Sequence, residues 1–231
     1  MALLLDVIRA ENFDIVAVIV SILSSLAVVF LTLPIHEYAH AFAAKKLGDN
    51  TAYYMSRNTL NPLAHIDWVG AAMILLFGIG WAKPVPVNAR NFQNPKTGMA
   101  ITAVAGPAAN IIVAFVAMIC ANASLFIYYS VAQSVIVYYV FYFFLSLAQI
   151  NVYLAIFNLI PIPPFDGSRV LTAILPDKAY YKLMQYERYS FILIAFVMLS
   201  DVLDKPLAFL ANGILTGLNY VAALPFEMLI K

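Results

Sequence analysis

The feature that most constrains this sequence is a series of long apolar runs separated by short polar segments. A helix needs about 20 apolar residues to cross the hydrocarbon core of a bilayer, and lipid offers no hydrogen bonds to an unpaired backbone. The sequence therefore predicts an all-α polytopic membrane protein with about five transmembrane helices. The predicted spans cover about 15–47, 98–121, 127–159, 189–203 and 207–224.

The connection between the first two core helices holds shorter elements. The apolar run at about 69–81 is too short to span and predicts a re-entrant or interfacial segment. Partial alternation of side chains at 51–55 predicts a short strand or β-hairpin. Pro84 and Pro86 disfavour helix in the residues before them, which predicts extended backbone there.

The composition agrees with a membrane protein and narrows its chemistry. Charged residues make up 11% of the chain, against roughly 25% in soluble domains. The net charge of +1 and the scattered basic residues do not support a nucleic-acid partner. Cys120 is the single cysteine, so any metal must be bound by nitrogen and oxygen atoms. We expect one membrane domain, 1–231, with a core at about 15–175 and additional C-terminal helices at about 176–231.

The distribution of Lys and Arg predicts the orientation in the cell membrane. Short cytoplasmic loops are enriched in these residues. One side of the predicted topology holds Arg9 and Lys205, and the other holds ten cations: Lys45, Lys46, Arg57, Lys83, Arg90, Lys96, Arg169, Lys178, Lys182 and Arg188. We therefore expect a multi-pass protein in the lipid bilayer with an extracytoplasmic N-terminus and a candidate site toward the cytoplasm.

The first predicted span carries the pattern His36-Glu37-Tyr38-Ala39-His40. Residues four apart share a helix face, so His36 and His40 can present their imidazoles to one zinc ion while Glu37 lies beside it. Such five-residue matches also occur by chance. Ionisable residues in an apolar span are costly, however, and usually have a function. The pattern predicts zinc-assisted hydrolysis, with Glu37 as the group that accepts the proton of water.

A catalytic zinc usually has three protein ligands, so one more must come from elsewhere. Asp166 is the leading candidate because it follows a proline-rich break and precedes Gly167, which allows close approach of the backbone. The alternative is an ordinary turn aspartate before a helix that starts near Ser168. His65 is the rival third ligand, although its polar surroundings are typical of a loop histidine.

Three motifs together resemble the site-2 protease family of intramembrane zinc metalloproteases. They are HEYAH in the first span, GPAAN (Gly106 to Asn110) in the next, and NLIPIPPFDG (Asn158 to Gly167) after the third. They occur in the order typical of the family, within roughly residues 30–175. The chain resembles a compact member without an inserted PDZ or appended CBS domain.

The resemblance implies one Zn²⁺ per chain, bound by His36, His40 and Asp166, with Glu37 as the catalytic acid/base. It also implies that Asn110 and Asn158 position the substrate or stabilise the oxyanion, although asparagines in membrane helices also serve simply to join helices. The expected substrate is a membrane protein with a transmembrane segment. Two positions depart from the family pattern: Phe165 stands where Leu is common, and Asn61 where Asp is common.

Two other functions remain open at the level of sequence. A membrane metal-ion transporter also places histidines and acids in its helices, but commonly shows repeated halves that this sequence lacks. A catalytically silent scaffold would have no use for Glu37. For the protease, a strand within 51–65 could bind an unwound substrate by adding it to a sheet edge.

Overall fold

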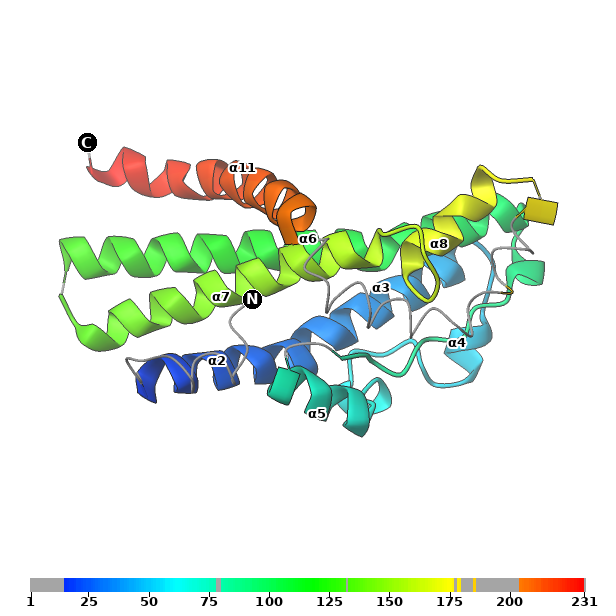
Figure 1. Cartoon of the computed structure of the whole chain (residues 1–231), viewed down its shortest axis with the longest axis horizontal. Coiled ribbons are helices and arrows are strands. Elements are labelled where there is room, and N and C mark those ends of the chain that lie inside the picture. Colours follow the sequence, from blue (N-terminus) through cyan, green and yellow to red (C-terminus); the bar gives the residue numbers. More distant parts are fainter. Residues whose placement is uncertain are drawn as a thin grey trace.

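The computed structural model describes residues 15–77, 80–131, 133–176, 178–179, 185 and 204–230. Every regular element among these residues is helical (Figure 1). Within these ranges, four helices are long and apolar enough to cross a membrane: Ile15–Lys46, Pro95–Ser130, Val135–Asn158 and Asp204–Met228. The predicted all-α membrane fold is confirmed, whereas the predicted span at 189–203 lies outside the described residues.

The first span is continuous but changes its helical pitch. Helix α2 (Ile15–Ala27) leads through a π-helical turn (Val28–Thr32) into α3 (Leu33–Lys46). Pro34 lies in the first turn of α3. A proline lacks an N–H and clashes with the carbonyl four residues earlier, so the wider turn before it relieves that clash. The helix therefore changes pitch just before the HEYAH motif.

Helices α6 (Pro95–Ser130) and α7 (Val135–Asn158) form the long hairpin to which the other helices are attached (Figure 1). The predicted boundaries at 121 and 127 were wrong, because α6 continues to Ser130. The polar residues near 122 do not end the helix. Asn122 donates to the carbonyl of Met118, and Ser124 donates to that of Cys120. These side chains are satisfied within the helix, so they do not mark a turn.

Small residues let α6 and α7 approach closely. Ala114 and Ala117 on α6 and Ala148 on α7 are almost completely buried in two adjoining apolar clusters. Small side chains are common where membrane helices pack, since lipid gives no hydrophobic drive for association and close van der Waals contact replaces it. Helix α11 (Asp204–Ile230) packs against the hairpin through Leu207 and Ala211. It confirms the last predicted apolar stretch and extends it at both ends.

The connection between the first span and α6 contains short helices: α4 (Thr51–Tyr54), a 3₁₀ turn (Pro62–Ala64), α5 (Trp68–Phe77) and a 3₁₀ turn (Ala89–Asn91). The strand or hairpin predicted at 51–55 was therefore wrong. The 69–81 run is indeed too short to span, because the ten residues of α5 reach only about 15 Å.

Asp49 explains why this region is helical and not a strand. Its buried carboxylate accepts hydrogen bonds from the backbone N–H and the hydroxyl of Thr51, and these contacts stabilise the start of α4. It also accepts from Asn88 N at 2.7 Å and from Asn91 Nδ2 at 2.7 Å. Burial by itself raises the pKa of Asp49, but these hydrogen bonds outweigh it and hold the pKa below its usual value. Asp49 thus fixes the 88–91 segment to the end of α3.

We expect Asp49→Ala to lower the stability of the folded protein by about 1–3 kcal/mol, because it leaves several buried donors without an acceptor. The measurement is the thermal denaturation midpoint in detergent. A group with a depressed pKa stabilises the fold above its unfolded pKa of about 3.9. The difference from wild type should therefore disappear as the pH falls through the folded pKa. Glu227→Ala, at an exposed position on α11, is the control, and equal midpoints for both variants would contradict the prediction.

Candidate active site

Three side chains from two distant parts of the chain meet at one point. His36 and His40 lie one turn apart on α3, and their Nε2 atoms are 3.0 Å apart. Asp166, which begins the short helix α8 (Asp166–Val170), places Oδ2 3.2 Å from His36 Nε2 and 3.1 Å from His40 Nε2. All three are mostly or completely buried. The cluster therefore has the two nitrogens and one oxygen that the sequence predicted.

Asp166 reaches the histidines because the chain turns back sharply after α7. Prolines at 161, 163 and 164 prevent the helix from continuing. At Gly167, an added Cβ would lie 2.5 Å from the carbonyl carbon of Leu159 and 2.6 Å from the carbonyl oxygen of Ile160. A residue with a side chain would not fit there without movement of the backbone. Gly167 thus permits the fold-back that brings Asp166 to α3.

The ring orientation and the neutral tautomer of His40 are set by α6. Its Nδ1 lies 2.7 Å from the carbonyl oxygen of Thr102. A carbonyl oxygen can only accept, so Nδ1 carries the proton and donates. In neutral His40 the lone pair is then on Nε2, the atom that faces His36 and Asp166. Histidine ligands of metals commonly have such an outer hydrogen bond, which fixes the ring orientation.

The spacing of the three atoms fits a tetrahedral metal ion. Zinc binds nitrogen and oxygen ligands at about 2.0–2.2 Å, which places neighbouring ligand atoms of a tetrahedral site about 3.3–3.6 Å apart, slightly further than here. The three separations here are 3.0, 3.1 and 3.2 Å. Among the described residues, His36, His40 and Asp166 form a group that could hold a metal ion. The donor set, two imidazoles and a carboxylate, is one that zinc accepts.

One face of α6 forms the wall of this cluster. Thr102, Gly106 and Asn110 are spaced four residues apart, so they share that face. At Gly106 an added Cβ would lie 2.6 Å from His36 Cε1 and closer still to His40 Nε2. The missing side chain leaves room for the two imidazoles and for anything bound between them.

Glu37 lies beside the cluster with one carboxylate oxygen already engaged. The backbone N–H of Val85 donates to Glu37 Oε2 at 2.8 Å. Glu37 is 8% exposed and Val85 is 6% exposed, so this hydrogen bond is largely shielded from solvent. Residues 80–88, where the sequence predicted extended backbone around Pro84 and Pro86, form neither helix nor strand, and Val85 contacts α3 directly.

The two predicted asparagines have different surroundings. Asn110 is 1% exposed, and its Oδ1 has no hydrogen-bond partner. Asn158 is half-buried and donates from Nδ2 to the carbonyl of Leu154 in its own helix, at 3.0 Å. Across the described part of the chain, no hydrogen bond joins either asparagine to the His36–His40–Asp166 cluster. Their predicted roles with substrate stay predictions.

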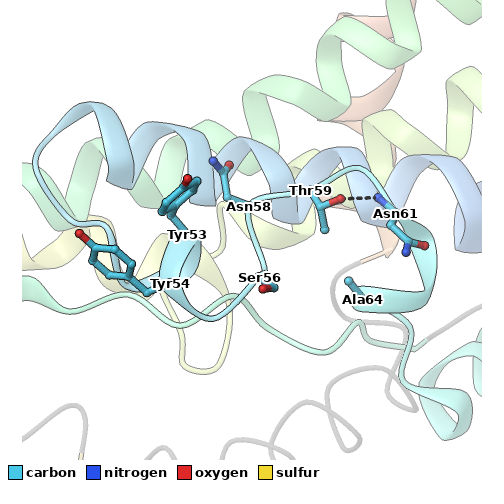
Figure 2. A pocket seen from close by; sticks show the side chains of 7 residues that line it. All are labelled: Tyr53, Tyr54, Ser56, Asn58, Thr59, Asn61 and Ala64. Atoms are coloured by element: carbon cyan, nitrogen blue, oxygen red, sulfur yellow. Dashed lines mark hydrogen bonds between the residues drawn. The ribbon is translucent and has the colours of Figure 1, made fainter.

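His65, the rival ligand, is engaged elsewhere. It is completely buried, and its Nε2 donates to the carbonyl of Thr59 at 2.8 Å. A separate pocket of about 580 Å³ lies over this loop, lined by Tyr53, Tyr54, Ser56, Asn58, Thr59, Asn61 and Ala64 (Figure 2). None of these residues belongs to the metal-type cluster, so the pocket and the cluster are distinct sites.

Sequence reasoning missed several residues around the site. Thr102 acts through its backbone carbonyl and Val85 through its backbone N–H, neither of which has a side-chain signal. Gly106 was noticed only as part of a motif. Asn151 is fully buried on α7 and donates to Thr32 Oγ1 at 3.2 Å, which joins α7 to the π-helical turn. A polar residue in an apolar span was a signal that could have identified it.

Comparison with known proteins agrees with this site. The model of Peptidase family M50 matches residues 123–200. The chain is 37% identical over 165 residues to "Putative zinc metalloprotease YwhC" of Bacillus subtilis, which covers 70% of this chain and 74% of that protein. It is 25% identical over 180 residues to "Putative zinc metalloprotease Rip2" of Mycolicibacterium smegmatis, covering 76% of this chain and 66% of that protein. No solved structure matches the chain.

Apolar helices long enough to span, together with a buried two-histidine, one-aspartate cluster next to a glutamate, define a membrane zinc metalloprotease. The length and identity of the match to the Bacillus protein allow a more specific statement. The chain belongs to peptidase family M50, the site-2 protease family. The resemblance found in the sequence motifs is therefore confirmed, and the cofactor is Zn²⁺.

We expect Gly106→Ala to lower the zinc content of the purified protein, because the new methyl group would collide with both imidazoles. The measurement is zinc per chain by atomic absorption. Gly213→Ala is the matched control, since a Cβ at that position on α11 would meet no atom within 4 Å. Wild-type zinc content in Gly106→Ala would contradict the prediction and mean that α3 and α6 are not in close contact at Gly106.

Proposed function

We propose that the protein is an intramembrane protease that hydrolyses peptide bonds within or near transmembrane segments of other membrane proteins. The observation that carries this proposal is the position of His36, Glu37 and His40 inside a helix long and apolar enough to span. His36 lies nine residues before Lys45, about 13 Å along the helix. A site at that depth lies within reach of a transmembrane segment that approaches through the bilayer.

His36, His40 and Asp166 are the proposed zinc ligands. A zinc ion held there supplies Lewis acidity, which lowers the pKa of water toward 7 and polarises a peptide carbonyl. The Thr102 carbonyl keeps His40 in the tautomer that can bind metal. The buried position of the three ligands excludes bulk water, which strengthens electrostatic interactions at the reacting bond.

Glu37 is the proposed general base and acid. Its Oε2 is held by Val85, which leaves Oε1 to accept a proton from the attacking water. The same oxygen can then deliver that proton to the departing amine nitrogen, which would otherwise be a poor leaving group. Asn110 is the proposed second polar contact for the substrate, because its buried amide oxygen has no partner in the protein. Asn158 has the same proposed role at the end of α7.

The proposed topology has five spans, with an extracytoplasmic N-terminus and the zinc site toward the cytoplasm. The excess of Lys and Arg in the segments on one side of the predicted spans supports this orientation. The polar connection that follows α3 carries several of the cations and lies at the same end of the molecule as α8 (Figure 1). Both ligand-bearing segments would then face the cytoplasmic side, where water for hydrolysis is available.

Glu37→Gln should abolish proteolysis and leave zinc binding intact. The amide cannot accept the proton, so we expect a decrease in rate of at least about 100-fold. The measurement combines cleavage of a fluorogenic transmembrane peptide in liposomes with zinc content. Metal transport that survives the change would favour a transporter, and full biological function in cells would favour a silent scaffold.

Single replacements of the ligands should separate the true third ligand from its rival. We expect His36→Ala and Asp166→Ala to lose zinc during purification, because two remaining ligands bind the ion weakly. His65→Ala should keep one zinc per chain, since His65 Nε2 is directed to Thr59. Equal zinc content in all three variants would rule out the proposed ligand set.

A further inference from the structure

The hydrogen bond from Val85 to Glu37 depends on an unusual stretch of backbone. Pro84 and Pro86 flank Val85, and neither has a backbone N–H. Val85 is therefore the single backbone donor within 84–86, and that donor is used on the carboxylate of Glu37. Any shift of this segment along α3 would leave Glu37 Oε2 without a backbone donor from it.

Arg57 holds that peptide from the opposite side. Its Nη2 donates to the carbonyl oxygen of Lys83 at 2.6 Å and to that of Pro84 at 3.3 Å. The Pro84 carbonyl and the Val85 N–H belong to the same peptide group. A cationic donor on the carbonyl polarises the peptide and makes its N–H a stronger donor. The guanidinium of Arg57 thus acts on the hydrogen bond that Glu37 receives.

Other contacts anchor this segment but do not touch that peptide. Lys83 N donates to the carbonyl of His65 at 2.8 Å, and Asn88 N donates to Asp49 Oδ2 at 2.7 Å. These two bonds fix the segment on either side of Val85. Between them, the peptide group whose N–H donates to Glu37 accepts a hydrogen bond from Arg57.

We propose that Arg57 is a positioning residue for Glu37, acting through the Pro84–Val85 peptide. The inference rests on the proposed role of Glu37 as general base and acid. Arg57 touches neither the zinc ligands nor the reacting atoms by any described contact. Its function is to keep one oxygen of Glu37 fixed so that the other is correctly placed for proton transfer.

The hydrogen bond itself can be observed without any activity assay. Proline labelled with ¹³C at the carbonyl and valine labelled with ¹⁵N select only Val85 and Val87, because no other valine follows a proline. We expect the Val85 amide proton to move upfield in Arg57→Ala and in Glu37→Gln, with Val87 as the reference in the same spectrum. Arg90→Ala, which removes the same charge from an exposed position in the following loop, should leave Val85 unchanged. An unmoved Val85 resonance in Arg57→Ala would overturn the proposal.

Kinetics then separate positioning from general loosening. With a fluorogenic transmembrane peptide containing a Gly-Pro break, we expect Arg57→Ala to lower kcat about tenfold, the usual effect of a weakened hydrogen bond to a charged group. KM and zinc content should remain at wild-type values. Arg57→Lys, which keeps one cationic donor, should recover part of the loss, and added guanidinium should recover part of it in Arg57→Ala.

The outcomes distinguish this inference from the proposed function. If Glu37→Gln is inactive and Arg57→Ala has wild-type kcat, only the role of Arg57 is wrong. If Glu37→Gln keeps its activity, the proposed function itself is wrong. Equal movement of Val85 and Val87, with a raised KM and no guanidinium rescue, would assign Arg57 a purely structural role and overturn the proposal.

Discussion

The close approach of His36, His40 and Asp166 is the interaction on which the rest of the structure depends. Polar groups at membrane depth are costly unless they are paired or bound to a metal. The two imidazoles come from one helix, but the carboxylate comes from a segment 126 residues further along than His40. The sharp turn after α7 and the absence of a side chain at Gly167 both serve to bring that carboxylate back to α3.

Helix α6 contacts the candidate site with one face and packs against α7 with another. Toward α3 it presents the Thr102 carbonyl, the bare backbone of Gly106 and the amide of Asn110. Toward α7 it presents small residues such as Ala114 and Ala117. A substitution on either face would therefore move the same rigid helix. This arrangement explains why the metal-type cluster can keep separations of 3.0–3.2 Å between atoms from two helices, α3 and α8.

Sequence patterns correctly predicted the features of the site that depend on neighbouring residues alone. The four-residue spacing of His36 and His40 implies a shared helix face whatever the tertiary fold, and the proline cluster before Asp166 implies a break in α7. The family resemblance added the expectation that these two segments meet. The end of α6 was not predictable in the same way. Asn122 is of a residue type common in turns, but its side chain donates hydrogen bonds to its own helix and to Asn219 on α11.

Long-range hydrogen bonds account for the remaining differences. The strand predicted at 51–55 is a helix because Asp49 holds Thr51 on one side and the 88–91 segment on the other. Alternation of side chains carries no information about that distant partner. The contact of Val85 with Glu37 joins residues 48 apart through a backbone group, which no side-chain pattern can reveal. The proposed role of Glu37 therefore depends partly on a backbone N–H, a group that every amino acid except proline has.

The position of the site along α6 gives an independent argument for its depth. Tyr128 on α6 and Tyr138 and Tyr142 on α7 gather in ring contacts near the turn of the hairpin. Tyrosines concentrate where a membrane meets water, so this group marks one interface. Gly106, which touches both histidines, lies 22 residues before Tyr128, about 33 Å along the helix. The hydrocarbon core is about 30 Å thick. In the proposed topology the cluster would therefore lie close to the opposite interface, where the polar connection after α3 would bring water to the substrate bond.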